Sequence, residues 1–283
     1  MQDHRTSSDE TGGNGRRKRR FTRIPMRFVI PNLVTLLAIC LGLTSIRLAT
    51  ESKFELAAIF IVLAAVLDGL DGRLARALDG ASRFGAELDS LADFVDFGVA
   101  PAFLLYFWSL HKIPSFGWFA ALVFAIAAAL RLARFNVMID DPNKPAWQAQ
   151  FFVGMPAPAG AIAAMLPIYL SYSALGLPEG RLFVIIEIIY VLGIAFLMAS
   201  RIPHFSGKQI GRVKREYFIV VLFAVAVFIL ALASFPMEVL IALTVSYLAL
   251  LPLAIRRHAR LSAETQVAEA GAAATALEPP HGP

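Results

Sequence analysis

The chain has 283 residues, of which 58% are hydrophobic and only 17% are charged. A soluble protein of this length does not need so much apolar sequence, so the composition excludes an ordinary soluble enzyme and indicates a polytopic membrane protein. The net charge of +5 would suit a nucleic-acid partner, but the basic residues are distributed as they are in membrane proteins. We therefore expect the lipid bilayer as a partner, and no nucleic acid.

The two ends of the chain are polar. Residues 1–27 form a basic tail that we expect to be cytoplasmic and largely disordered, with no cleavable leader. The run RRKRR at 16–20 predicts a topology determinant that contacts anionic lipid. An integral membrane catalytic domain is expected over 28–256, followed by a second disordered cytoplasmic tail over 257–283.

Apolar segments follow one another through the membrane domain, most of them near the length that a helix needs to cross the hydrocarbon core. They cover residues 28–49, 54–78, 86–109, 114–138, 154–174, 182–200, 217–235 and 237–255. The second and third segments differ from the rest because they carry aspartates. The sequence therefore predicts an all-α membrane protein with about eight transmembrane helices.

The basic residues alternate between the connections that join these segments. Of the 26 Lys and Arg, all but Arg47, Lys53, Lys112 and Arg181 fall in the tails or around the second, fourth and sixth connections. By the positive-inside rule this places both termini in the cytoplasm, and an even number of spans agrees with that placement. We expect a multi-pass protein of the inner, cytoplasmic membrane.

Aspartates crowd the junction of the second and third segments. They are Asp68, Asp71, Asp79, Asp89, Asp93 and Asp96. Asp68 and Asp71 are three positions apart, and Asp89 and Asp93 are four apart, so each pair lies on one face of its helix. Counted from the outer helix ends, Asp68 is about 21 Å and Asp93 about 25 Å into a hydrocarbon core about 30 Å thick. Four carboxylates are therefore expected to converge at the cytoplasmic edge of the bilayer.

Four like charges cannot share such a site without compensation. Arg73, Arg76 and Arg83 lie nearby in the sequence, but one or two divalent cations would compensate the charge more fully. All-oxygen ligands favour a hard ion such as Mg²⁺, Mn²⁺ or Ca²⁺. Gly72 and Gly85 stand beside the carboxylates, where small residues let a ligand approach the backbone closely.

The residues around the aspartates follow the pattern D-x2-D-G-x2-A-R-x8-G-x3-D-x3-D. This pattern resembles that of the CDP-alcohol phosphotransferases. The matching residues are Asp68, Asp71, Gly72, Ala75, Arg76, Gly85, Asp89 and Asp93, with no departure at any position. The stretches at 88–102, 130–137 and 152–161 look like the bacterial phosphatidylserine synthases within that family. With the first segment included, the likeness covers about residues 24–170.

The resemblance implies an enzyme that transfers a phosphatidyl group from CDP-diacylglycerol to the hydroxyl of L-serine and releases CMP. It implies that the four motif aspartates hold a pair of divalent metal ions, Mg²⁺ or Mn²⁺, and that Asp93 is also the general base. It further implies a homodimer. The residues that it assigns to the CDP-lipid site are Asp68, Gly72, Ala75, Arg76 and Gly85.

The serine site is predicted from residues outside the motif. Arg131 and Arg134 share a helical face at the cytoplasmic end of the fourth segment, with Asn136 beside them. We expect one of these arginines to bind the serine carboxylate; the alternative is that both are positive-inside anchors. Asp96, one turn beyond Asp93, either meets the serine ammonium or pairs with a neighbouring arginine, and the second role is preferred.

Two other functions remain open. Another member of the same family, acting on glycerol phosphate, inositol phosphate or choline, would share every motif residue. A divalent-cation transporter would carry acids at mid-membrane and towards the far side, whereas these aspartates cluster at one edge. Glu187 does lie in a span on the far side, where we expect it to make an interhelical or subunit contact.

Overall fold

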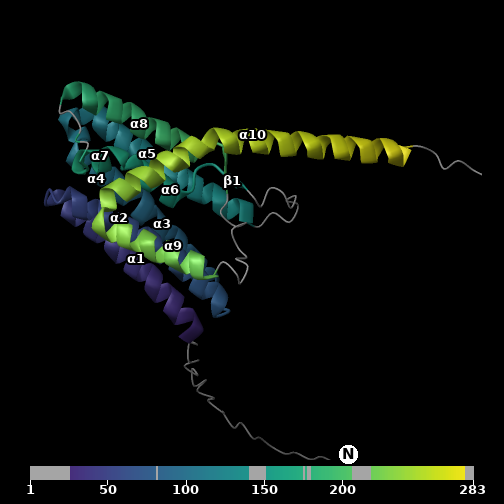
Figure 1. Cartoon of the computed structure of the whole chain (residues 1–283), viewed down its shortest axis with the longest axis horizontal. Coiled ribbons are helices and arrows are strands. Elements are labelled where there is room, and N and C mark those ends of the chain that lie inside the picture. The colour runs from purple at the N-terminus through teal and green to yellow at the C-terminus, as the bar shows by residue number, and fades with distance from the viewer. Residues whose placement is uncertain are drawn as a thin grey trace, which may run out of the picture.

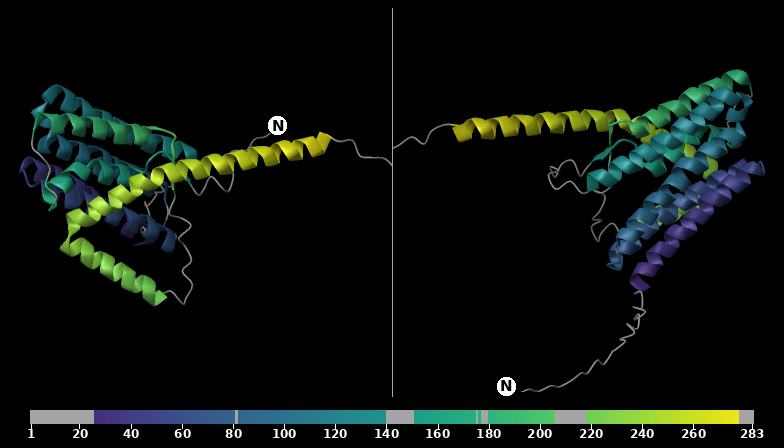
Figure 2. Two further views of the ribbon diagram at one scale, coloured as in Figure 1. Left: turned by 45° about the horizontal axis from the view of Figure 1, so that its top comes forward. Right: turned by 180° about the vertical axis from the view of Figure 1, so that it is seen from behind.

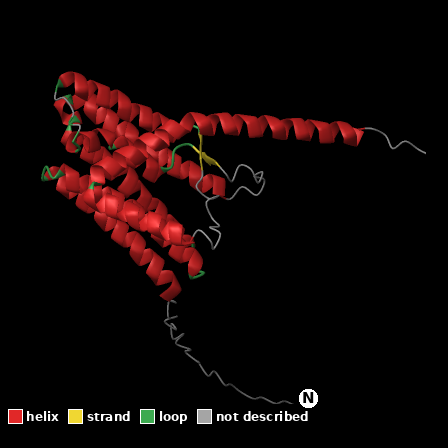
Figure 3. Ribbon diagram, viewed as in Figure 1, coloured by secondary structure: helices red, strands yellow, loops and turns green. Residues whose placement is uncertain are grey.

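The computed structural model describes residues 26–80, 82–139, 151–174, 176, 180–205 and 218–277. Within these residues the chain is helical apart from two short strands, β1 (Phe151–Val153) and β2 (Pro203–Phe205), which pair antiparallel (Figure 3). The basic run at 16–20 lies outside the described residues.

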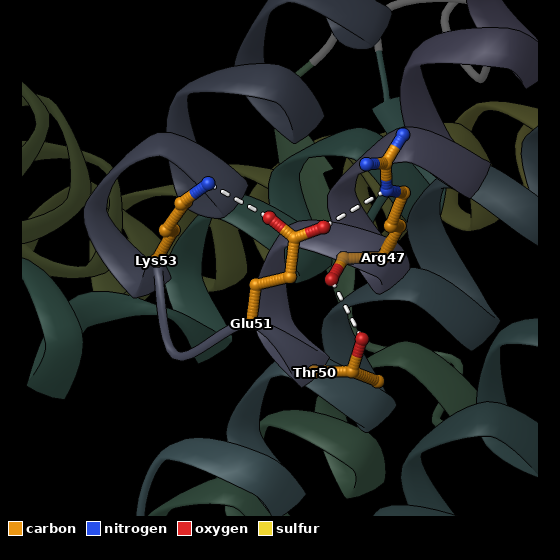
Figure 4. Close-up of polar contacts among 4 residues, drawn as sticks. All are labelled: Arg47, Thr50, Glu51 and Lys53. Carbon is orange, nitrogen blue, oxygen red and sulfur yellow. Dashed lines mark hydrogen bonds and ion pairs between the residues drawn. The ribbon is translucent and has the colours of Figure 1, made fainter.

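The first two helices form a hairpin. α1 (Met26–Thr50) and α2 (Phe54–Ala77) pack against each other, joined by a turn of three residues. Glu51 holds this turn, because its carboxylate accepts hydrogen bonds from Lys53 Nζ at 2.8 Å and Arg47 Nε at 2.9 Å (Figure 4). The hydrogen bonds from Lys53 and Arg47 hold the pKa of Glu51 below its usual range. The short turn brings the far half of α2, which carries the first motif aspartates, back beside the start of α1.

The third predicted segment is one rod made of three parts. They are α3 (Arg83–Phe94), the π-helical turn η1 (Val95–Val99) and α4 (Ala100–Trp108). Ser82 caps the rod, because its hydroxyl accepts a hydrogen bond from the Gly85 backbone N–H at 3.0 Å. In the π-turn the Ala100 N–H bonds to the Val95 carbonyl five residues back. Pro101 follows at once, and a helical proline disturbs the turn before it, which accounts for the wide turn here.

The remaining helices complete the bundle. They are the 3₁₀ turn η2 (Leu110–Lys112), α5 (Pro114–Ile139), α6 (Ala157–Ala164), α7 (Leu166–Tyr172), α8 (Arg181–Ala199), α9 (Phe218–Ser234) and α10 (Pro236–Leu277). The fifth predicted segment is broken between α6 and α7. Pro167 has no N–H to give to the Ala163 carbonyl four residues back, and Tyr190 of α8 donates its hydroxyl to that carbonyl at 2.7 Å.

Within the described residues, five helical stretches are long and apolar enough to cross a membrane. They are Val29–Thr50, Arg83–Trp108, Pro114–Val137, Arg181–Ala199 and Pro236–Arg257. A multi-pass helical membrane architecture is therefore supported, while the number of eight spans and the side on which the termini lie stay predictions. In α2 the charged residues are spaced so that no 18-residue stretch holds two or fewer of them, α6 and α7 are short, and α9 has 17 residues.

The surface and the core both suit a bilayer. Large apolar side chains such as Leu33, Phe116, Leu182 and Phe196 are exposed on the outside of the bundle. A monomeric soluble protein rarely exposes so much apolar surface, whereas lipid covers it without cost. The core is rich in alanine, which lets helices approach closely in a membrane.

The expectation of a disordered tail from residue 257 is wrong for most of that tail. α10 continues as one helix to Leu277, 42 residues in all, bends as it leaves the bundle and then extends away from it (Figures 1 and 2). The physical reason is local, because Ala, Glu, Gln, Leu and Arg dominate this stretch and all have high helix propensity. The first prolines of the tail come only after the helix has ended. Residues 278–283 lie outside the described residues.

Candidate active site

Three of the four expected metal ligands come together. Asp68 and Asp71 lie one turn apart on α2, and Asp89 lies on α3, which follows after a short connection. One carboxylate oxygen from each of the three lies within 4.8 Å of the others. The set consists of oxygen atoms only, which is the donor chemistry that hard divalent cations prefer.

Asp93 differs from the other three aspartates. It lies one turn beyond Asp89 and is not part of the compact group of three oxygens. Its carboxylate lies close enough to that of Asp68 for the two to share a hydrogen bond. Its Oδ1 atom is buried and, within the part of the chain that the structure describes, has no hydrogen-bond partner. One oxygen of Asp93 therefore contacts the cluster, and the other is left for a cation or a proton.

No arginine forms an ion pair with the cluster among the described residues. Among the described residues, the ion pairs are those of Glu51 in the α1–α2 turn, far from these aspartates. Oδ1 of Asp71 is buried and unpaired, as is Oδ1 of Asp93. Buried carboxylate oxygens without a donor are costly, and a bound cation removes that cost. The side chains therefore fit a divalent metal centre.

α1 contributes polar groups that the sequence analysis did not single out. Thr35 Oγ1 donates to Asp71 Oδ2 at 2.6 Å, and both residues are buried, at 4% and 3% exposure. Asn32, one turn earlier on α1, places its Oδ1 against Gly85 of α3. The available signal was two polar residues three positions apart in an otherwise apolar segment. That signal alone does not say which helix they face.

A cavity of ≈ 190 Å³ opens beside the aspartates. Its lining includes four of the five residues predicted for the CDP-lipid site, Gly72, Ala75, Arg76 and Gly85, together with Asp71, Asp89 and the α1 residues Asn32 and Thr35. The fifth predicted residue, Asp68, lies in the acidic cluster and is not part of this lining. Six of the eight motif residues therefore line one hollow, and Asp68 and Asp93 are not part of its lining.

The two motif glycines have different roles. A Cβ atom added at Gly85 would lie 2.9 Å from Asn32 Oδ1 and 3.1 Å from Ser82 Oγ, so a side chain there forces its neighbours apart. A Cβ atom at Gly72 would meet nothing closer than Arg76 Nη1 at 3.6 Å. Gly85 is therefore required by the packing of α1 against α3. Gly72 instead keeps the cavity open, which favours the predicted ligand access.

The structure separates the two arginines of the predicted serine site. Arg131 on α5 is 8% exposed and lies in the electrostatic field of Asp93 and Asp68. Arg134 Nη1 donates to the carbonyls of Ala199 at 2.8 Å and Ser200 at 3.1 Å. These carbonyls end α8, where a cation offsets the negative end of the helix dipole. Arg131 therefore belongs to the acidic site, and Arg134 joins two helices.

Asn136 also links helices. Its Nδ2 donates to Ser90 Oγ at 2.9 Å, which ties the end of α5 to α3 at an exposed position. Ser90 follows Asp89 directly, so this bond helps to hold the helix turn that carries a cluster carboxylate.

Asp96 is buried without a charged partner. It lies in the π-turn η1, is 1% exposed, and its Oδ1 has no hydrogen-bond partner among the described residues. The preferred expectation, that Asp96 pairs with a neighbouring arginine, is wrong for the part of the chain that the structure describes. The π-turn shifts the residues after Asp93 relative to a regular helix, and Asp96 turns towards Gly42 of α1.

The sequence pattern of the CDP-alcohol phosphatidyltransferase family matches residues 28–198. The chain belongs to this family. The match runs from α1 almost to the end of α8, so it contains the acidic cluster, the cavity and Arg131. α9 and α10 of this CDP-alcohol phosphatidyltransferase lie beyond it.

Three curated relatives of this CDP-alcohol phosphatidyltransferase share the name CDP-diacylglycerol–serine O-phosphatidyltransferase. The protein from Mycobacterium leprae is 42% identical over 240 residues, which cover 84% of this chain and 78% of the relative. The protein from Helicobacter pylori strain 26695 is 35% identical over 206 residues, 71% of this chain and 82% of the relative. The protein from Bacillus subtilis is 36% identical over 179 residues, 62% of this chain and 91% of the relative.

Glu187 lies away from the acidic cluster of this phosphatidyltransferase. It is 1% exposed on α8, beside Ser109 and in the field of Lys112, at the end of α5 opposite to Arg131. Ser109 joins α4 to η2, so the neighbouring groups belong to different helices. This placement agrees with the predicted interhelical contact.

Proposed function

We propose that this CDP-alcohol phosphatidyltransferase is a phosphatidylserine synthase. It transfers the phosphatidyl group of CDP-diacylglycerol to the hydroxyl of L-serine and releases CMP. The observation that carries the proposal is the convergence of Asp68, Asp71 and Asp89 beside a cavity lined by the glycines, the alanine and the arginine of the motif. The name shared by the relatives in three different genera supports serine as the acceptor.

The CDP-lipid occupies the cavity beside the aspartates. Arg76 supplies a cation for the pyrophosphate, and Gly72 lets the head group lie against the backbone, while Gly85 lines the same cavity. A lipid of this kind has its tails in the bilayer and its charged head at the interface. A cavity at the ends of α1, α2 and α3 is a place where such a head group can meet a water-soluble alcohol.

Two divalent ions, Mg²⁺ or Mn²⁺, are proposed at the acidic cluster. Asp68, Asp71 and Asp89 hold them, and Asp93 joins the site through the carboxylate oxygen that contacts Asp68. When bound, such ions neutralise the charge of the pyrophosphate and of the departing CMP.

Asp93 is proposed as the general base. Its Oδ1 takes the proton of the serine hydroxyl while the serine oxygen forms a bond to the β-phosphorus and the bond from that phosphorus to CMP breaks. Asp93 suits this role better than the neighbouring aspartates. One of its carboxylate oxygens contacts Asp68, and the other, Oδ1, accepts no hydrogen bond from the described residues and can take a proton. CMP leaves with the electron pair of the broken bond.

Serine is proposed to be recognised by two opposite charges. Arg131 binds the carboxylate, because it is buried, lies in the electrostatic field of Asp93 and Asp68, and its guanidinium can form two parallel hydrogen bonds. Asp96 binds the ammonium, because it is a buried carboxylate with an unpaired oxygen one turn beyond the base. Arg134 and Asn136, engaged with α8 and α3, become supports of this site rather than ligands of serine.

The cellular arrangement is part of the proposal. The acidic site faces the cytoplasm from the inner membrane, both termini lie in the cytoplasm, and the enzyme works as a homodimer. The distribution of Lys and Arg along the chain supports the orientation.

The test is CMP release by the purified protein in detergent with CDP-diacylglycerol and Mn²⁺ or Mg²⁺. Serine, glycerol 3-phosphate, inositol phosphate and choline are supplied in turn, and release with serine alone is expected. Release with another alcohol would keep the metal site but replace the acceptor. Release with none, together with Mn²⁺ flux into sealed vesicles, would support the transporter alternative instead.

A further inference from the structure

Thr35 of α1 contacts one oxygen of a cluster aspartate. Its Oγ1 lies 2.6 Å from Asp71 Oδ2 and 3.1 Å from the carbonyl oxygen of Pro31, which is one turn back on the same helix. Both Thr35 and Asp71 are buried, so water does not compete for this contact. A hydroxyl has only one hydrogen and cannot serve both oxygens fully.

The distances decide which oxygen receives the hydrogen when Asp71 is ionised. A separation of 2.6 Å is in the range of a charge-assisted O–H···O⁻ bond, whereas 3.1 Å to Pro31 is long for a hydroxyl donor. A carbonyl in a helix also has a backbone donor available four residues on. The Thr35 hydroxyl therefore donates to Asp71 Oδ2.

This bond leaves the two oxygens of Asp71 in different states. Oδ2 is occupied by Thr35, while Oδ1 is buried and has no partner among the described residues. The short hydrogen bond from Thr35 to one oxygen restricts the rotation of the Asp71 carboxylate about its last bond. The free oxygen is then held in one orientation before any ligand arrives.

We propose that Thr35 is a positioning residue of the metal centre: it holds Asp71 so that Oδ1 is presented to the cation. The inference rests on the proposed function, because it assumes that Asp71 is a metal ligand. A positioning role for Thr35 depends on its hydroxyl, whereas a packing role would depend only on the shape of its side chain. A partner that orients a metal ligand in this way typically contributes 10- to 100-fold in metal affinity, on the order of what is expected here.

The test compares Thr35→Val, which keeps the shape and removes the hydroxyl, with Thr35→Ser, which keeps the hydroxyl. Thr44→Val is the matched control, because Thr44 lies on the same helix and its hydroxyl bonds to the Cys40 carbonyl within α1. Mn²⁺ is titrated into the purified full-length protein in detergent without CDP-lipid or serine, and free Mn²⁺ is followed by electron paramagnetic resonance. Thermal unfolding in chelator reports whether each variant is folded.

Thr35→Val is expected to bind Mn²⁺ about 10- to 100-fold more weakly, while Thr35→Ser and Thr44→Val stay close to wild type. The Mn²⁺ concentration for half-maximal CMP release should rise in Thr35→Val, with kcat recovered at saturating Mn²⁺. Equal Mn²⁺ affinity in Thr35→Val and wild type overturns the inference, as does a Thr35→Ser variant as weak as Thr35→Val.

Two further outcomes are also decisive. Wild type that binds no Mn²⁺ overturns the metal centre itself, and the proposed function with it, which separates that failure from a failure of the inference alone. If Thr35→Val does not fold, Thr35→Ala is used instead, and its Mn²⁺ affinity is compared with that of wild type in the same way. Loss of folding in both variants overturns the inference in favour of a purely structural role.

Discussion

Asp96 occupies the space that a side chain at Gly42 would need. A Cβ atom added at Gly42 would overlap Asp96 Oδ1 and lie 2.9 Å from its Cγ, so the absence of a side chain on α1 makes room for a buried carboxylate on η1. The contact joins the first helix to the turn directly beyond the proposed base. A substitution at position 42 can therefore displace the Asp96 side chain while Asp96 itself is unchanged.

Gly42→Ala is expected to move Asp96 and to weaken serine binding. Overpacking of this kind costs about 1–3 kcal/mol of stability. Thermal unfolding in detergent should show the loss, and the KM for serine should rise more than the KM for CDP-diacylglycerol. Gly193→Ala in α8 is the control, because a Cβ atom there meets nothing within 4 Å. A Gly42→Ala variant with unchanged stability and kinetics would contradict the described packing of α1 on η1.

Asp93→Asn is expected to abolish turnover while the protein still binds CDP-lipid. The amide cannot take the proton of the serine hydroxyl, and loss of a general base lowers kcat by about 10²- to 10⁴-fold. Single-turnover CMP release and a separate CDP-lipid binding assay measure the two effects. Asp79→Asn is the matched control, because Asp79 lies outside the motif at φ 47°, a backbone conformation that asparagine adopts readily. Substantial turnover in Asp93→Asn would remove the base from this position.

Arg131→Ala and Arg134→Ala should have different effects. Loss of a hydrogen-bonded charge at Arg131 should raise the KM for serine about 10- to 100-fold and leave the KM for CDP-diacylglycerol nearly unchanged. Arg134→Ala should chiefly lower the thermal stability, because it frees the carbonyls of Ala199 and Ser200 at the end of α8. Steady-state kinetics with both substrates separate the two. Equal changes in both KM values for Arg131→Ala would make Arg131 an anchor.

Removal of divalent metal should stop the reaction. Excess EDTA is expected to abolish CMP release, and added Mg²⁺ or Mn²⁺ should restore it. A cation that binds only the folded protein also stabilises it, so Mn²⁺ should raise the unfolding temperature of the chelated protein. The Asp89→Asn variant should lose most of that rise, because one of the three clustered carboxylates is gone. Activity that persists in excess EDTA would argue against a metal-dependent reaction.

Hydropathy and helical period predicted the bounds of several helices and the aspartates that share a helix face. The predicted segments 54–78 and 114–138 differ by at most one residue at each end from α2 (Phe54–Ala77) and α5 (Pro114–Ile139). Asp68 and Asp71 do share a face, because three positions along a helix bring side chains together wherever the helix lies. The C-terminal tail was predicted to be disordered, but it is helical to Leu277, because its Ala- and Glu-rich sequence has a high helix propensity.

The amino-acid sequence by itself determined a helical membrane protein with an acidic motif, because hydropathy, charge and helical period are properties of the chain. Contacts between helices depend instead on their packing and relative register, which no local pattern contains. Only the tertiary structure therefore brought Thr35 to Asp71 and separated Arg131 from Arg134. It also left Asp96 without a charged partner among the described residues, because the π-turn re-aims a single side chain within an otherwise regular rod.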